Sequence, residues 1–277
     1  MSETIEKFNK HVMQTYGRLP IVLEKGHNDD AVDENDKKYI DFGSGIGTNS
    51  LGYCNDKWAD AVCAQARAIQ HTSNYFYTKV QADFAAKLCE LTGYTDVFFG
   101  NSGAEANECA IKLARKYSFD KYGKGRHTIV TLVNSFHGRT LATLSATGQD
   151  VFHNYFFPFV EGFVNVPAND IDALRKLIAE DKTICAVMFE FVQGEGGVNP
   201  LDKAFVDEIF KLCGENDILT VADEVQTGVG RTGAILTSMR YGVKPDITTL
   251  AKGIAGGVPM GACLADEKCA GVLVKGT

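Results

Sequence analysis

The repeated alternation of apolar strands with amphipathic helices is the feature that most constrains the fold of this chain. From about residue 80 onward, short apolar runs alternate with segments of helical period. We predict strands over residues 95–99, 128–133, 163–166, 184–191, 218–222 and 247–250, and helices over residues 105–121, 171–180 and 203–215. This order predicts an α/β fold whose mainly parallel sheet is flanked by helices on both faces.

The N-terminal segment does not follow this alternation. We expect a helix over about residues 3–16, then an extended arm and a short strand over residues 38–42. We therefore interpret residues 1–45 as an N-terminal arm of a smaller domain, and residues 46–277 as the large domain.

Composition narrows the classes of protein that fit. The 277 residues are 45% hydrophobic and 23% charged, as in ordinary soluble globular proteins. A formal net charge of −7 argues against a nucleic-acid-binding surface, which needs clustered Lys and Arg. The N-terminus resembles no secretory signal, and no apolar run approaches the roughly 20 residues needed to span a bilayer. Eight cysteines without a Cys-x-x-Cys pair indicate free thiols in a reducing, cytoplasmic compartment and no metal site.

A polar cluster follows each of several predicted strands. These clusters are Asn101-Ser-Gly-Ala, Asn134-Ser-Phe-His, Gln193-Gly-Glu, Asp223-Glu-Val-Gln and Ala251-Lys-Gly. In parallel sheets, ligands bind beyond the carboxyl ends of the strands. We therefore expect the clusters to converge on one pocket.

The first cluster joins a strand to a helix. The backbone N–H groups of Gly103 and Ala104 would point away from the helix start, where the helix dipole favours an anion such as phosphate. An ordinary turn capped by Ser102 explains the same residues. The sequence alone leaves both interpretations open.

Asp223 and Glu224 follow an apolar strand, as in proteins that hydrolyse nucleotides. Such a protein would need a G-x-x-x-x-G-K-[ST] run, which the sequence lacks. A dinucleotide site is also disfavoured, because Thr48 occupies the third glycine position of a G-x-G-x-x-G pattern. Asp223 could instead pair with a protonated ring nitrogen.

Lys252 comes directly after the last predicted strand. A lysine at a buried strand end is costly unless it is neutralised, and Schiff-base formation would neutralise it. A lysine that extends into solvent is the simpler alternative. Phe136 could cover a ring and Arg139 could hold a carboxylate, although a core Phe beside a solvated Arg is equally consistent. Glu195, in a glycine-rich loop, could pair with an arginine or be solvated.

Taken in order, the clusters extend into longer motifs that cover the chain from about residue 16 to its end. These motifs are Tyr16-Gly-Arg-Leu-Pro, Asn101-Ser-Gly-Ala-Glu-Ala-Asn-Glu, Phe136-His-Gly-Arg-Thr, Glu190-Phe-Val-Gln-Gly-Glu-Gly-Gly, Ala222-Asp-Glu-Val-Gln-Thr-Gly-Val-Gly-Arg-Thr-Gly and Leu250-Ala-Lys-Gly-Ile-Ala-Gly-Gly. They resemble the motifs of class III, pyridoxal-phosphate-dependent aminotransferases. Phe191 departs from the family, which commonly has proline there. The resemblance implies the type I fold of pyridoxal-phosphate-dependent transferases.

The resemblance also implies a role for each matched residue. Lys252 would hold pyridoxal 5'-phosphate as a Schiff base, and Asp223 would pair with the ring nitrogen and keep the ring an electron sink. The remaining cofactor contacts would come from Ser102, Gly103, Ala104, Phe136, Glu224, Val225 and Gln226. Arg139 would bind the substrate α-carboxylate with Tyr16 nearby, and Glu195 would act as the gate that admits two different substrates.

The implied reaction moves the amino group of N2-acetyl-L-ornithine to 2-oxoglutarate in two half-reactions, with Lys252 as general base. The products would be N-acetylglutamate semialdehyde and glutamate, in arginine biosynthesis. Ile46 favours the acetylated donor, because ornithine-specific relatives tend to carry a tyrosine there. Ornithine or succinylornithine as donor, and an aminomutase reaction, stay open as alternatives.

Members of the family are longer than this chain, and form homodimers. We therefore expect a C-terminal domain to be absent, together with an arginine that would pair with Glu195. A truncated chain that binds cofactor or partner subunits with little catalysis is a further alternative.

Overall fold

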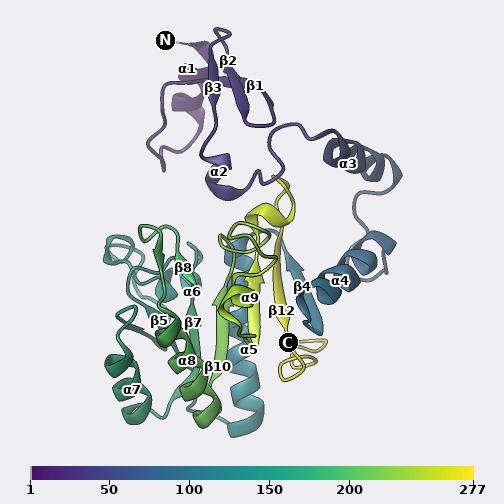
Figure 1. Ribbon diagram of the computed structural model, residues 1–277. Helices are drawn as coiled ribbons and strands as arrows, with labels where there is room; N and C mark the ends of the chain where they lie inside the picture. The colour runs from purple at the N-terminus through teal and green to yellow at the C-terminus, as the bar shows by residue number, and fades with distance from the viewer. Residues whose placement is uncertain (1) are drawn as a thin grey trace. The chain divides into compact units, whose positions relative to one another are not determined.

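The computed structural model describes residues 2–277 (Figure 1). The chain divides into two compact units, Met1–Thr72 and Ser73–Thr277. The first unit extends past the boundary expected at residue 45, because Tyr53 exchanges two backbone hydrogen bonds with Asn28. The assignment of these units to a small and a large domain stays a prediction.

The first unit contains a small antiparallel sheet of β1 (Leu23–His27), β2 (Asp30–Asp33) and β3 (Lys38–Ile40). Its helices are α1 (Glu3–His11), α2 (Ser44–Gly47) and α3 (Asp56–Ala68). The prediction that the first helix continues to residue 16 is wrong, since Val12 already has extended backbone. No residue of α1 is buried, so no packing within the described structure favours a longer helix.

The second unit is built on a seven-stranded sheet with the order β4-β12-β11-β10-β7-β5-β6 (Figure 1). These strands are β4 (Asp96–Gly100), β5 (Thr128–Leu132), β6 (Phe163–Val166), β7 (Ile184–Phe189), β10 (Leu219–Asp223), β11 (Ile247–Leu250) and β12 (Gly261–Ala265). β12 runs antiparallel to both of its neighbours, β4 and β11, so β4 keeps the direction of the other strands. The predicted mainly parallel α/β sheet is confirmed.

Each strand predicted for this sheet is present, with small shifts at the ends. The largest shift is in the strand expected over residues 184–191, which ends at Phe189. After it, the short strands β8 (Val192–Gln193) and β9 (Asn199–Pro200) pair with each other as a separate two-stranded sheet. Several elements were not predicted: α4 (Lys79–Thr92), α6 (Leu141–Ala146), α9 (Thr237–Tyr241), β12, and the 3-10 turns η1 (Asp150–Phe152) and η2 (Lys252–Ile254).

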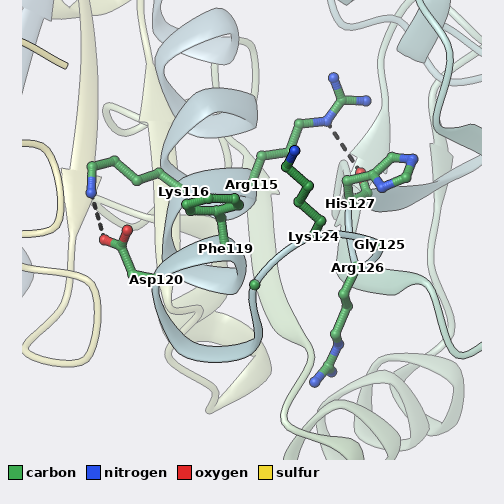
Figure 2. Close-up of a pocket in the computed structure, with 9 residues that line it drawn as sticks. Arg115, Lys116, Phe119, Asp120, Lys124, Gly125, Arg126 and His127 are labelled. Carbon is green, nitrogen blue, oxygen red and sulfur yellow. Dashed lines mark hydrogen bonds and ion pairs between the residues drawn. The ribbon is translucent and has the colours of Figure 1, made fainter.

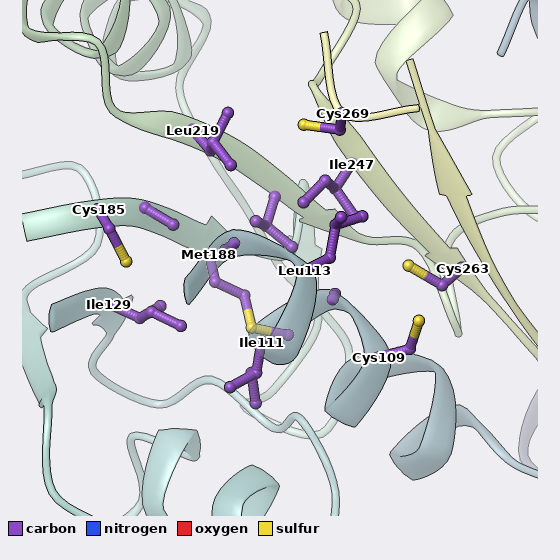
Figure 3. Packing of buried hydrophobic residues seen from close by; sticks show 14 of the residues in the cluster. Cys109, Ile111, Leu113, Ile129, Cys185, Met188, Leu219, Ile247, Cys263 and Cys269 are labelled. Carbon is purple, nitrogen blue, oxygen red and sulfur yellow. The ribbon is translucent and has the colours of Figure 1, made fainter. Parts of the chain in front are cut away.

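Helices cover both faces of the sheet. The long helix α5 (Gly103–Tyr122) packs on one face, where Ile111, Leu113 and Met188 are buried among side chains of the strands (Figure 3). The helices α7 (Ile171–Glu180) and α8 (Lys203–Asn216) pack on the other face. From Ala186 to Phe189, successive residues of β7 alternate between these two clusters, which explains why this part of the strand is apolar on both faces. No helix among residues 2–277 is long and apolar enough to cross a bilayer.

Phe189 offers a test of this core, because it is fully buried and contacts the rings of Phe191 and Phe210. We expect Phe189→Ala to lower the free energy of unfolding by about 3–5 kcal/mol in urea titrations followed by circular dichroism. The control is Leu141→Ala, whose side chain is 62% exposed, and we expect a change within about 0.5 kcal/mol. Equal losses in the two variants would contradict the packing described.

Candidate active site

The polar clusters gather at one edge of the sheet, as the sequence predicted. β4, β5, β7, β10 and β11 all run in the same direction, so their carboxyl ends share that edge. Each of these strands ends immediately before, or within a few residues of, one of the clusters. All of these clusters lie in the second unit, and their positions relative to one another follow from the sheet.

Asp223, at the end of β10, is the acid predicted to contact a ring nitrogen. The residue is buried, with 3% of its surface exposed. Oδ2 accepts hydrogen bonds from Asn107 Nδ2 and contacts His137 Nδ1, both at 2.8 Å, and Oδ1 accepts one from the Val225 N–H at 3.0 Å. A buried carboxylate requires such donors, because it has lost its water.

The partners of Asp223 are themselves held in place. The oxygen of the Asn107 amide accepts from Thr249 Oγ1 at 2.6 Å, and the amide nitrogen also donates to the His137 carbonyl oxygen at 2.8 Å. His137 is buried, and its Nε2 has no hydrogen-bond partner among the described residues. With Nδ1 facing a carboxylate, that nitrogen carries the proton and Nε2 is the acceptor in the neutral ring.

Lys252 lies on the neighbouring strand end, directly after β11. Its backbone has φ of 48°, a left-handed conformation that is uncommon for residues other than glycine and is found preferentially at functional sites. Burial lowers the pKa of its amine below the ordinary value, and the carboxylates of Asp223 and Glu195 act in the opposite direction. The amine therefore lies within electrostatic reach of both acids. The alternative that Lys252 extends into solvent does not fit this partly buried position.

The start of α5 combines both interpretations of its sequence. Ser102 is the N-cap, since its Oγ accepts from the Glu105 N–H at 3.2 Å, and the Glu105 carboxylate accepts from the Asn101 N–H. The N–H groups of Gly103 and Ala104 belong to the first turn, where amides have no partner within the helix. A methyl group at Gly103 would lie 2.7 Å from Val225 Cγ1, so the helix start is packed tightly against the loop after β10.

Phe136 and Arg139 follow β5. Phe136 is half-buried, its ring meets that of Phe152 edge to face at 5.8 Å, and the Arg139 guanidinium lies 5.9 Å from the Phe136 ring centre. Arg139 is exposed, so it is accessible to a ligand. These positions agree with the predicted ring contact and carboxylate contact, which stay predictions.

The loop after β10 supplies residues with different contacts. Gln226 lies directly against the loop after β7, because a methyl group at Gly194 would be 1.7 Å from its Oε1. Both oxygens of Glu224 accept from backbone N–H groups at the start of α9, those of Thr237 and Ser238. Burial raises the pKa of Glu224. Glu224 therefore anchors α9, and its predicted contact with a cofactor is not supported by these bonds.

The remaining predicted residues are exposed. Glu195 lies in the loop after β7, near Lys252. Tyr16 belongs to the first unit and is 61% exposed, and its role stays a prediction.

Sequence reasoning missed several residues of the site. Asn107 was not singled out, although it is a polar side chain within a buried apolar stripe of α5. His137 was not assigned a role either, and the structure pairs it with Asp223. Glu190 and Arg231 also act on the Lys252 amine, Glu190 by raising its pKa and Arg231 by lowering it.

A separate pocket of about 610 Å³ lies near the end of α5, away from these strand ends (Figure 2). Three of its cations are engaged by the protein: Arg115, Lys116 and Arg126. Arg115 donates to the carbonyl oxygens of His127 and Glu161, and Lys116 pairs with Asp120. These side chains hold α5 to the neighbouring segments, so we do not include the pocket in the site.

Comparison with known proteins agrees with the geometry. Residues 12–277 match the family of class III aminotransferases, and the chain belongs to that family. It is 52% identical to the acetylornithine aminotransferase of Haemophilus ducreyi, over 96% of this chain and 67% of that protein. It is 44% identical to the succinylornithine transaminase of Citrobacter koseri, over 100% of this chain and 68% of that protein.

The fold is also that of solved aminotransferases. An ornithine aminotransferase from Toxoplasma gondii superimposes with a TM-score of 0.94 at 32% identity, over 99% of this chain and 65% of that chain. That structure has partial occupancy of PLP at its active site. The predicted type I fold is therefore confirmed, and the chain spans about two thirds of the length of these relatives.

Gly261, the first residue of β12, tests how this edge is assembled. A methyl group there would lie 2.1 Å from the carbonyl oxygen of Ser102, a backbone atom that cannot turn away. We expect Gly261→Ala to lower the free energy of unfolding by about 1–3 kcal/mol, by overpacking. In the control, Gly214→Ala in α8, nothing lies within 4 Å, and a gain of up to about 1 kcal/mol is expected. An unchanged midpoint for Gly261→Ala in urea would refute the close approach.

Proposed function

We propose that this chain carries the active site of a pyridoxal-phosphate-dependent aminotransferase that uses N2-acetyl-L-ornithine and 2-oxoglutarate. The observation that carries the proposal is the pairing of two strand ends. A buried carboxylate at Asp223 and an amine of lowered pKa at Lys252 lie at the ends of the adjacent strands β10 and β11. One acid and one partly desolvated amine are what a cofactor with a basic ring nitrogen and an aldehyde requires.

The residues present fit pyridoxal 5'-phosphate. The first-turn amides of Gly103 and Ala104 suit a phosphate. The Asp223 carboxylate, held by Asn107 and His137, suits a protonated pyridine nitrogen. Phe136, in the loop after β5, would stack on the cofactor ring. Gln226, in the loop after β10, would contact the ring hydroxyl. The bound cofactor would supply an electron sink for a carbanion.

The chain's own residues would handle binding and proton transfer. Arg139 would bind the α-carboxylate of the donor, since an exposed guanidinium can hold a carboxylate by two parallel hydrogen bonds. The Lys252 amine, whose pKa is lowered by burial, would act as general base. It would remove a proton from the donor carbon that bears the transferred amino group. Glu195 would act as the gate acid beside it, and Tyr16 would complete the substrate site.

The choice of donor rests on relatives. The Haemophilus protein supports the acetylated donor, and Ile46 is consistent with it. The Citrobacter protein supports succinylornithine as a second candidate, because its sequence identity to this chain, 44%, is only moderately lower than the 52% of the Haemophilus protein. We further propose a homodimer, and a cytoplasmic location that suits the eight free cysteines.

Replacement of the amine tests the cofactor. We expect wild-type chain mixed with pyridoxal phosphate to show visible absorption that borohydride makes permanent at Lys252. Lys252→Ala should lose that labelling, and any glutamate formation should fall by about a thousandfold or more. The control is Lys244→Ala, an amine that hydrogen-bonds the Gly93 carbonyl oxygen, which should be labelled as wild type is. Labelling of Lys252→Ala to the wild-type extent would contradict the proposal.

The amino donor is tested by following glutamate formed from 2-oxoglutarate. We expect the specificity constant for N2-acetyl-L-ornithine to exceed that for ornithine by about tenfold or more, because a site that pairs with the acetamide leaves groups unpaired when it is missing. Succinylornithine is measured beside it. A preference for ornithine would overturn the proposed donor, and absence of net glutamate with every donor would favour an aminomutase or a chain that only binds.

A further inference from the structure

Glu190 is a buried acid that the proposed chemistry does not use. It follows β7, is 5% exposed, and connects two different loops. Oε2 accepts from the Phe136 N–H at 3.0 Å, and Oε1 accepts from the Gly194 N–H at 3.4 Å. The first amide belongs to Phe136, whose ring is proposed to contact the cofactor, and the second belongs to Gly194, which immediately precedes Glu195.

The ionised carboxylate is suited to this double role. Both of its oxygens are acceptors, so it can serve two N–H groups at once. A protonated carboxyl has one O–H donor, and one of the two amides would then face a donor. Protonation would therefore weaken one of the two connections, because a hydroxyl oxygen is a poorer acceptor than a carboxylate oxygen.

We propose that Glu190 is a positioning residue whose carboxylate bridges the loop of Phe136 and the loop of Glu195, so that the ring contact and the substrate gate are set together. The roles of these two loops rest on the proposed function. The bridge itself rests on the two hydrogen bonds and on the burial of the acid.

The bridge should depend on pH near neutrality. Burial raises the pKa of Glu190 to about 7, and Asp223 acts in the same direction, while His137 and the two amides lower the pKa. Both hydrogen bonds lower the pKa of the buried acid, so losing them while Glu190 stays buried would raise that pKa further. For this local change, linkage makes the bridge strengthen as the pH rises through the pKa and weaken as the pH falls. The charged or titratable groups that face Glu190 are Asp223, His137 and the Lys252 amine.

Hydrogen–deuterium exchange of the 277-residue chain tests this bridge without any activity. At pH 8, we expect Glu190→Gln to speed exchange about tenfold in peptides that cover residues 134–139 and 193–198, since an amide can accept with one oxygen only. In the wild-type chain, lowering the pH from 8 to 6 should cause the same loss of protection, after correction for intrinsic exchange. In Glu190→Gln, the corrected rates should not depend on pH over that range.

Glu224→Gln is the matched control. Glu224 is also a buried acid that accepts from two backbone amides, but both belong to the start of α9. Its substitution should speed exchange over residues 236–241 and leave residues 193–198 protected. Where cofactor is bound and glutamate is formed, Glu190→Gln should raise KM for both substrates more than it lowers kcat.

Wild-type protection of both loops in Glu190→Gln would overturn the bridge. So would corrected wild-type rates that do not change between pH 6 and pH 8, a measurement that needs no variant. If the wild-type chain forms no glutamate, the proposed function fails, and the exchange rates still decide whether Glu190 joins the loops.

Discussion

The buried carboxylate of Asp223 is the constraint on which the rest of the site depends. Removing a carboxylate from water costs several kcal/mol, and only donors with good geometry offset that cost. Here the donors come from α5, from the loop after β5 and from the loop after β10, through Asn107, His137 and Val225. One charge therefore holds together three elements that are distant in the sequence, and an error in any of them would leave it unpaired.

The sheet provides the geometry that makes such pairing possible. β10 and β11 are parallel neighbours, so Asp223 and Lys252 emerge beside each other at the same edge. β12 inserts antiparallel between β11 and β4, which restores the direction of β4 and brings the start of α5 to that edge as well. Because a strand's direction decides at which edge its end emerges, the start of α5 lies at the same edge as the ends of β10 and β11.

Much of this arrangement could be predicted from the sequence, and the reasons are local. Strands buried on both faces read as continuous apolar runs, and polar residues at their ends mark the ligand edge. β12 could not be predicted in this way, because the Gly and Ala residues of Gly261–Ala265 have low strand propensity and its direction depends on its partners. The end of α1 was missed because helical period alone does not show whether a helix has anything to pack against. The partners of Asp223 were missed because Asn107 and His137 become meaningful only when α5 and β10 are brought together.

The acids of the site show why residue type alone does not assign a role. Asp223, Glu190 and Glu224 are all buried within the second unit, and each accepts hydrogen bonds. Asp223 faces an imidazole and an amide and stays available to a cationic ligand, whereas Glu224 gives both oxygens to the start of a helix. Glu190 lies between these cases, since it serves two loops and its pKa, raised by burial to about 7, leaves its charge adjustable. The surroundings therefore divide chemically similar groups into a proposed ligand for the ring, a helix anchor and a proposed link between loops, and this division can be seen only after folding brings the strand ends together.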